Sequence, residues 1–165
     1  CIRDRRTGVH HDAIARDIAG ADVTREDRVS GVSESPYDLV IVEDDADHRT
    51  MLAEILSMDR HLVRAYPSAE DAHAAILVRT PDIVITDLKL GGVAGWKLAE
   101  MLRTDPRTRH VALVAVTGAV DPRREVVTHF DAYLPKPIDL DVLRELVRNL
   151  ASMSRAKRLR VKQAR

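Results

Sequence analysis

The stretch LVIVEDD at residues 39–45 is an apolar run that ends in three acids. Three further short apolar runs end in polar residues of other chemical kinds, at IVITD (83–87), VALVAVT (111–117) and AYLPK (132–136). Continuous apolar runs are typical of parallel strands that are buried on both faces. The carboxyl ends of such strands lie along one edge of the sheet, where ligands bind. The four runs therefore predict a site that combines acids, a hydroxyl and an amine.

The segments between these runs are long enough for crossover helices and carry helix start signals. Ser68 forms a capping-box pattern with Asp71, and a less apolar strand over 61–66 suits a sheet edge. The predicted helix starts lie at Asp47, Ser68, Gly95, Asp121 and Asp139. We expect an α/β fold of five (βα) units, (βα)5, a doubly wound parallel five-stranded sheet in the flavodoxin-like strand order 2-1-3-4-5.

The chain has 165 residues and a formal net charge of zero. That zero hides an uneven distribution, because residues 37–151 hold 19 acids and 14 Lys or Arg, whereas 152–165 hold six basic residues and no acid. Residues 1–36 carry almost no large apolar side chains. We therefore expect a flexible N-terminal arm over 1–36, one domain over 37–151 and a basic C-terminal tail over 152–165.

Several function classes are excluded by composition. Cys1 is the single cysteine, which excludes disulfides within the chain, thiolate zinc sites and thiol catalysis. The seven histidines show no metal-ligand spacing. No apolar stretch approaches the roughly 18 residues of a membrane span, so we expect a cytoplasmic protein without membrane contact. The basic tail has no aromatic residue, which argues against nucleic-acid binding.

Four motifs resemble those of the receiver domain of two-component response regulators. They are IVEDD (41–45), VITDLKLGGVAGW (84–96), VAVTGA (114–119) and YLPKP (133–137). Their order and spacing are also similar to the family's, and the resemblance covers residues 38–151. It implies that one aspartate is the phosphoacceptor and that one Mg²⁺ is the cofactor. The phosphoacceptor would be Asp87, and the metal ligands would be Glu43, Asp44, Asp87 and the backbone carbonyl of Lys89.

The same resemblance assigns roles to three further side chains. Lys136 would contact the phosphoryl oxygens, and its bond to Pro137 would be cis. Thr117 would bind the phosphoryl group and would form a switch pair with Tyr133. Their movement would change the face made by the fourth helix, the fifth strand and the fifth helix, through which a homodimer is one option.

The expected function is that of a phosphoacceptor in two-component or phosphorelay signal transduction. A histidine kinase or a histidine phosphotransfer protein would supply the phosphoryl group, and a downstream protein target would read the result. We expect self-phosphorylation and autodephosphorylation but no turnover of a metabolite. Two alternatives are a pseudo-receiver that acts without phosphorylation and the terminal receiver of a hybrid histidine kinase. A haloacid-dehalogenase-like phosphatase would need a second acid where Lys89 stands.

Some positions depart from the family pattern or have a plainer interpretation. Gly91 stands where the family often has proline, which predicts a looser loop after the phosphoacceptor. Lys89 and Ala119 lie where side chains line the approach of water to the phosphoryl group, and small Ala119 would leave that path open. Asp45 is expected to be a solvated or helix-capping acid, and Trp96 a packing or surface residue.

Overall fold

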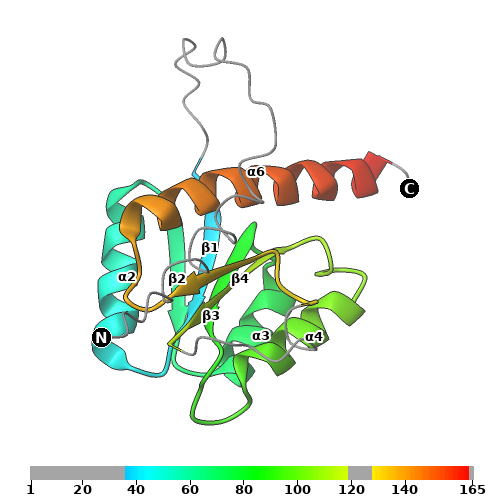
Figure 1. Cartoon of the computed structure of the whole chain (residues 1–165). Coiled ribbons are helices and arrows are strands. Elements are labelled where there is room, and N and C mark those ends of the chain that lie inside the picture. The colour runs from blue at the N-terminus through cyan, green and yellow to red at the C-terminus, as the bar shows by residue number, and fades with distance from the viewer. Residues whose placement is uncertain (1–35, 119–127, 164–165) are drawn as a thin grey trace, which may run out of the picture. The chain divides into compact units, whose positions relative to one another are not determined.

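A computed structural model describes residues 36–118 and 128–163 of the chain. The strands form one parallel sheet in the order β2-β1-β3-β4-β5 (Figure 1), which confirms the predicted α/β class and strand order. The described elements are β1 (Asp38–Val42), α2 (Ala46–Met58), β2 (Leu62–Tyr66), α3 (Ala69–Val78), β3 (Ile83–Asp87), α4 (Gly95–Thr104), β4 (Ala112–Thr117), β5 (Ala132–Pro135) and α6 (Leu140–Gln163).

Two predicted regions lie largely outside the described residues. The helix predicted from Asp121 falls mainly in 119–127, together with Ala119. The N-terminal arm predicted over 1–36 is described only at Pro36.

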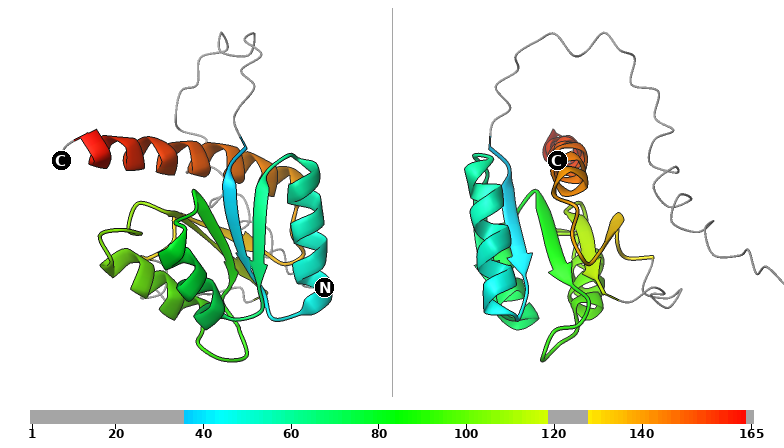
Figure 2. Two further views of the ribbon diagram at one scale, coloured as in Figure 1. Left: turned by 180° about the vertical axis from the view of Figure 1, so that it is seen from behind. Right: turned by 60° about the vertical axis from the view of Figure 1, so that its left-hand side comes forward.

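Helices cover both faces of the sheet (Figure 2). A separate hydrophobic core lies on each face. In β1, Leu39 and Ile41 pack on the side of α2 and α6, whereas Val40 and Val42 pack on the side of α3 and α4. This division follows from the strand geometry, since successive side chains point to opposite faces. Because both faces are covered, every residue of β1, β3 and β4 is buried, as the apolar runs predicted.

Three of the four helix starts predicted within the described residues agree with the structure, and one of them is Gly95, the first residue of α4. Ser68 caps α3 by accepting from the amide of Asp71, and Asp139 accepts from two amides at the start of α6. The start of α2 was predicted at Asp47, which is wrong. Asp45 is the N-cap instead, and its side chain accepts from the His48 amide at 2.9 Å. That hydrogen bond lowers the pKa of Asp45, as expected for a capping acid.

The last helix, α6, runs across the amino ends of β1 and β3 and continues well past residue 151 (Figure 1). The boundary predicted between domain and tail therefore falls inside a helix. Ser154 is buried, and its hydroxyl donates to the carbonyl of His110 at 2.9 Å. The basic segment thus contacts the domain from Ser154 to Arg158.

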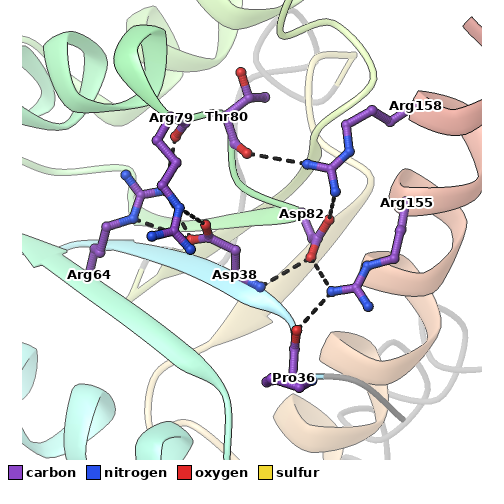
Figure 3. A network of polar contacts seen from close by, with 8 residues as sticks. All are labelled: Pro36, Asp38, Arg64, Arg79, Thr80, Asp82, Arg155 and Arg158. Atoms are coloured by element: carbon purple, nitrogen blue, oxygen red, sulfur yellow. Dashed lines mark hydrogen bonds and ion pairs between the residues drawn. The ribbon is translucent and has the colours of Figure 1, made fainter. Parts of the chain in front are cut away.

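Buried Asp82 holds this part of α6 to the sheet (Figure 3). Its carboxylate accepts from Arg155 at 2.6 Å and lies 3.2 Å from Arg158, the second contact being an ion pair without aligned hydrogen-bond geometry. Asp82 also accepts from the backbone amide of Asp38 at 3.1 Å. Arg155 further donates to the carbonyl of Pro36 and lies over the ring of Tyr37. We call Asp82, Arg155 and Arg158 the Asp82 network.

A neighbouring ion pair joins β1 to the edge strand. Arg64 of β2 donates to Asp38 at 2.9 Å, and Arg79 pairs with the other oxygen of the same carboxylate at 2.7 Å. Arg64, the arginine predicted inside the edge strand, therefore forms an ion pair with Asp38 at the start of β1 (Figure 3). Among the described residues, no helix has both the length and the apolar character that a membrane span requires.

The Asp82 network predicts a loss of stability for Asp82→Asn. The amide keeps an acceptor for the Asp38 amide but removes the charge that pairs two arginines. Because Asp82 is almost wholly buried and the arginines are partly exposed, we expect the free energy of unfolding to fall by about 2–3 kcal/mol. Urea unfolding of wild type and Asp82→Asn measures this difference in the free energy of unfolding.

A matched control is Asp105→Asn, which breaks the exposed ion pair with Arg107. We expect that change to cost much less than Asp82→Asn, because water and salt screen a pair at the surface. Equal costs for the two variants would show that the Asp82 network does not stabilise α6.

Candidate functional site

Three ionisable side chains meet at the carboxyl edge of the sheet. Glu43 follows β1, Asp87 ends β3, and Lys136 follows β5. Each lies two residues beyond a core side chain on the α2 and α6 face, and those three core residues are Ile41, Ile85 and Leu134. Because side chains two apart along a strand point the same way, all three groups are directed to one side of the sheet edge.

Lys136 bridges the two acids. Its Nζ donates to Asp87 Oδ2 at 2.6 Å and to Glu43 Oε2 at 2.9 Å. Glu43 is 3% exposed and Asp87 is 8% exposed, so both carboxylates are nearly removed from water. The Lys136 amine therefore reaches across the end of β4 to pair two acids on neighbouring strands.

The pKa of Lys136 reflects two opposing effects. Partial burial of the amine acts to lower its pKa, but the hydrogen bonds and negative charges of Asp87 and Glu43 outweigh burial and raise the pKa above its usual 10.5. The amine is therefore charged at neutral pH. The Lys136–Pro137 peptide bond is cis, as the resemblance implied.

Asp87 has a second hydrogen bond in addition to that from Lys136. Its Oδ1 accepts from the backbone amide of Lys89 at 2.8 Å. Both carboxylate oxygens are therefore oriented, one by a strand-end lysine and one by the loop that follows β3. The contact to Asp87 comes from the amide of Lys89, while a metal-ligand role for its carbonyl stays a prediction.

Asp44 stands apart from the two paired acids. Its side chain is exposed, and a methyl group placed on Gly91 would lie 3.5 Å from its Oδ2. Within residues 36–118 and 128–163, no three His, Cys, Asp or Glu side chains converge closely enough to hold a metal ion. The predicted ligands Glu43 and Asp87 are thus brought together around an ammonium group, with Asp44 beside the loop after β3.

Thr117 and Tyr133, the predicted switch pair, lie on adjacent strands. Thr117 ends β4, is 7% exposed, and its carbonyl accepts from the Lys136 amide at 2.9 Å. Tyr133 pairs in register with Ala115, two residues before Thr117, so the two side chains share one face of the sheet. The ring of Tyr133 packs edge-on against Phe130, and burial raises its pKa to about 12.

The looser loop predicted after Asp87 stays a prediction, and the structure shows one contact between this loop and α3. Glu70 accepts from the Val93 amide at 3.3 Å, and a methyl group on Gly92 would lie 3.3 Å from the same carboxylate. The absence of a side chain at Gly92 thus lets the acid approach. Sequence reasoning missed this contact because Glu70 lies 23 residues before Val93.

Arg49 is a second residue that sequence reasoning missed. From the first turn of α2 it donates to the backbone carbonyls of Glu43 and Asp44, at 2.7 and 3.1 Å. The sequence gives no indication of this contact, because Arg49 binds backbone atoms and not a complementary side chain.

Gly95 allows α4 to begin directly against the end of β3. A methyl group on Gly95 would lie 2.0 Å from the backbone oxygen of Asp87 and 2.9 Å from Thr86 Oγ1. No side chain larger than hydrogen fits unless α4 moves away from β3. The spacing from Asp87 to Gly95 is therefore a packing requirement.

Gly95→Ala is expected to lower the free energy of unfolding by about 1–3 kcal/mol, because the new methyl group meets rigid backbone. Gly118→Ala is the control, since no atom of residues 36–118 and 128–163 lies within 4 Å of a methyl group there. Urea unfolding of both variants checks the difference. Two equally stable variants would contradict this account of the packing.

The raised pKa of Lys136 predicts a pH dependence. A lysine whose pKa is higher in the folded state stabilises the fold below the unfolded pKa, and this contribution is lost as pH rises through the folded value. Wild type should therefore be more stable than Lys136→Met at neutral pH. The gap should shrink above pH 10.5, as measured by urea unfolding. A gap that stays constant would contradict the pairing.

Comparison with known proteins agrees with this geometry. The sequence model of the response regulator receiver domain matches residues 39–148. The phosphate regulon transcriptional regulatory protein PhoB of Pseudomonas aeruginosa is 30% identical over 120 residues, which are 71% of this chain and 51% of PhoB. The transcriptional regulatory protein TcrA of Mycobacterium tuberculosis is 32% identical over 129 residues, 78% of this chain and 48% of TcrA. The chain spans about half the length of these two regulators.

Solved structures are similar as well. A CheY-like receiver domain from Methylobacillus flagellatus superposes with a TM-score of 0.65 at 32% identity, covering 70% of this chain and 99% of that one. TrrA from Thermotoga maritima, solved in complex with Mg²⁺ and BeF, gives a TM-score of 0.63 at 23% identity over 68% of this chain and 96% of TrrA, a likeness that bears on the fold alone. This chain therefore belongs to the response regulator receiver domain family of two-component signalling.

Proposed function

We propose that this domain accepts a phosphoryl group on Asp87 in a Mg²⁺-dependent reaction with a phosphohistidine donor. The observation that carries the proposal is the Lys136 bridge, which holds a cation 2.6 Å from a buried strand-end carboxylate and 2.9 Å from a second one. A protein scaffold rarely buries two acids beside each other without a task for them.

The chemistry assigns a task to each group. A carboxylate oxygen of Asp87 attacks phosphorus, and the bond from phosphorus to the donor's imidazole nitrogen breaks as the acyl phosphate forms. Phosphoryl transfer depends mainly on positioning and on neutralising charge. The Lys136 ammonium and the Thr117 hydroxyl, both at the same sheet edge, would contact the phosphoryl oxygens.

The donor types at this edge suit Mg²⁺, and in the structure two of the acids are paired with the Lys136 amine instead. The ion prefers oxygen ligands, keeps several waters and is usually held by one or two carboxylates together with phosphate oxygens. Glu43, Asp44 and Asp87 supply carboxylates, and the carbonyl of Lys89 belongs to the loop whose amide already contacts Asp87. When bound, the ion would neutralise the acids and the incoming phosphoryl group.

The signal would leave through a change of surface rather than through a chemical product. Movement of Thr117 towards the phosphoryl group would alter the packing of Tyr133, which shares its sheet face and contacts Phe130. The change would reach the outer surface at the β5 edge of the sheet, which includes β5 and α6. This surface is the candidate binding site for a downstream protein or a second copy of the chain. Self-phosphorylation and autodephosphorylation are the only chemistry proposed, in the cytoplasm and without turnover of a metabolite.

The test is labelling with acetyl phosphate, read by mass spectrometry of the intact protein. Wild type should gain one phosphoryl group in the presence of Mg²⁺ and none after chelation of the metal. Asp87→Asn should gain none, because the nucleophile is absent. Lys136→Met should label about a hundredfold more slowly, because the positive charge that stabilises the transferring group is lost.

Asp105→Asn is the matched control, because it removes a partly exposed acid that is paired with Arg107 in the turn after α4. It should label as wild type does. A folded wild-type domain that gains no label with Mg²⁺ would instead favour the pseudo-receiver alternative, in which the surface acts without phosphorylation.

A further inference from the structure

Arg49 ties the acidic turn after β1 to α2. Its Nη1 donates to the carbonyl of Glu43 at 2.7 Å and to that of Asp44 at 3.1 Å. We propose that Arg49 is a positioning residue for cation binding, which acts by holding the backbone of Glu43 and Asp44 so that their carboxylates can serve as ligands. This inference rests on the proposed Mg²⁺-dependent function.

The geometry separates the backbone of the acidic turn from its side chains. Arg49 engages both carbonyls, while the Glu43 carboxylate contacts Lys136 and accepts from the amide of Asp45 at 3.3 Å. The amide of Glu43 donates to the carbonyl of Tyr66 at 3.2 Å. The turn is therefore held on two sides. The Arg49 guanidinium holds it from α2, and the Tyr66 carbonyl holds it from the edge strand β2.

A positively charged hydrogen-bond donor is suited to this task. Two consecutive carbonyls after a strand lose their sheet partners, and an arginine can satisfy both with one nitrogen. The bonds are charge-assisted and so are stronger than those of a neutral donor. Groups that orient metal ligands in this way typically contribute about 10- to 100-fold to metal affinity.

Charge alone predicts the opposite effect. A guanidinium near the acids repels an incoming divalent cation, so its removal would strengthen binding if Arg49 acted only through its field. If Arg49 positions the turn, its removal weakens binding. The sign of the change in Mg²⁺ affinity therefore distinguishes the two roles.

The experiment measures Mg²⁺ binding by isothermal titration calorimetry with MgCl₂ on the full chain. Arg49→Met should weaken binding about tenfold, and Arg49→Lys, which keeps a cationic donor, should fall between this variant and wild type. Arg144→Met is the control, because it removes the same charge from an arginine that pairs with Asp59 at the other end of α2. Its affinity should stay within about twofold of wild type.

A second measurement separates positioning from phosphoryl chemistry. The rate of labelling by acetyl phosphate is followed as a function of Mg²⁺ concentration. Arg49→Met should need more Mg²⁺ for half-maximal rate but should recover the wild-type rate at saturation, because Arg49 acts through the ligands and not on the phosphoryl group. Unchanged or tighter Mg²⁺ binding in Arg49→Met would overturn the inference.

Failure of the proposed function would look different. If wild type neither binds Mg²⁺ nor accepts label, that function is wrong, and a role for Arg49 in cation binding falls with it. If wild type does both and Arg49→Met matches it, only the inference is wrong. Hydrogen exchange at the Asp45 amide provides the structural readout, since a released turn should exchange faster in Arg49→Met than in Arg144→Met.

Discussion

Glu43 follows β1, Asp87 ends the neighbouring parallel strand β3, and both residues are almost wholly buried. Two carboxylates taken out of water side by side are strongly unfavourable unless a cation pairs with them. Lys136 supplies that cation from β5, on the far side of β4. The bridge therefore depends on the full strand order, because any other placement of β5 would remove the amine from the two acids.

The amino edge of the sheet has a similar arrangement of buried acids and cations. Asp38 and Asp82 lie at the starts of β1 and β3, and arginines from β2, from the segment after α3 and from α6 pair with them. Ion pairs thus hold β1 and β3 at both ends, and two apolar cores pack against their middles. The amino-edge pairs fix α6, whereas the carboxyl-edge pairs hold groups suited to phosphoryl transfer.

The carboxyl edge combines rigid and exchangeable contacts. Gly95 lets α4 pack against the backbone of Asp87. The side chains of Glu70 and Arg49 bind backbone atoms of the loop after β3 and of the acidic turn after β1. The Lys136 bridge is made by side chains alone. In the proposed reaction this is the contact that gives way, since an ion and a phosphoryl group would take over the pairing of acids and amine while the backbone stays in place.

The sequence predicted the strand order, the two-faced burial of the strands and the convergence of Glu43, Asp87 and Lys136. Burial and convergence follow from local patterns, because apolar runs mark buried parallel strands and their carboxyl ends share one edge. The strand order follows from the right-handed crossovers between those strands. The start of α2 was misplaced by two residues because two aspartates offered equivalent caps, and only the fold selected Asp45. The local sequence pattern cannot distinguish Asp45 from Asp47 as the cap of α2, since both precede helix-forming residues.

The partners of charged side chains were decided by the tertiary structure alone. Lys136 and Glu43 are 93 residues apart, and Arg155 and Asp82 are 73 apart, so no local spacing relates them. The basic segment after residue 151 looked like a separate tail because it lacks an apolar stripe, yet α6 continues through it by ionic contacts with Asp82. Apolar periodicity can be read along a chain, but the pairing of distant charges exists only once the sheet has brought them together.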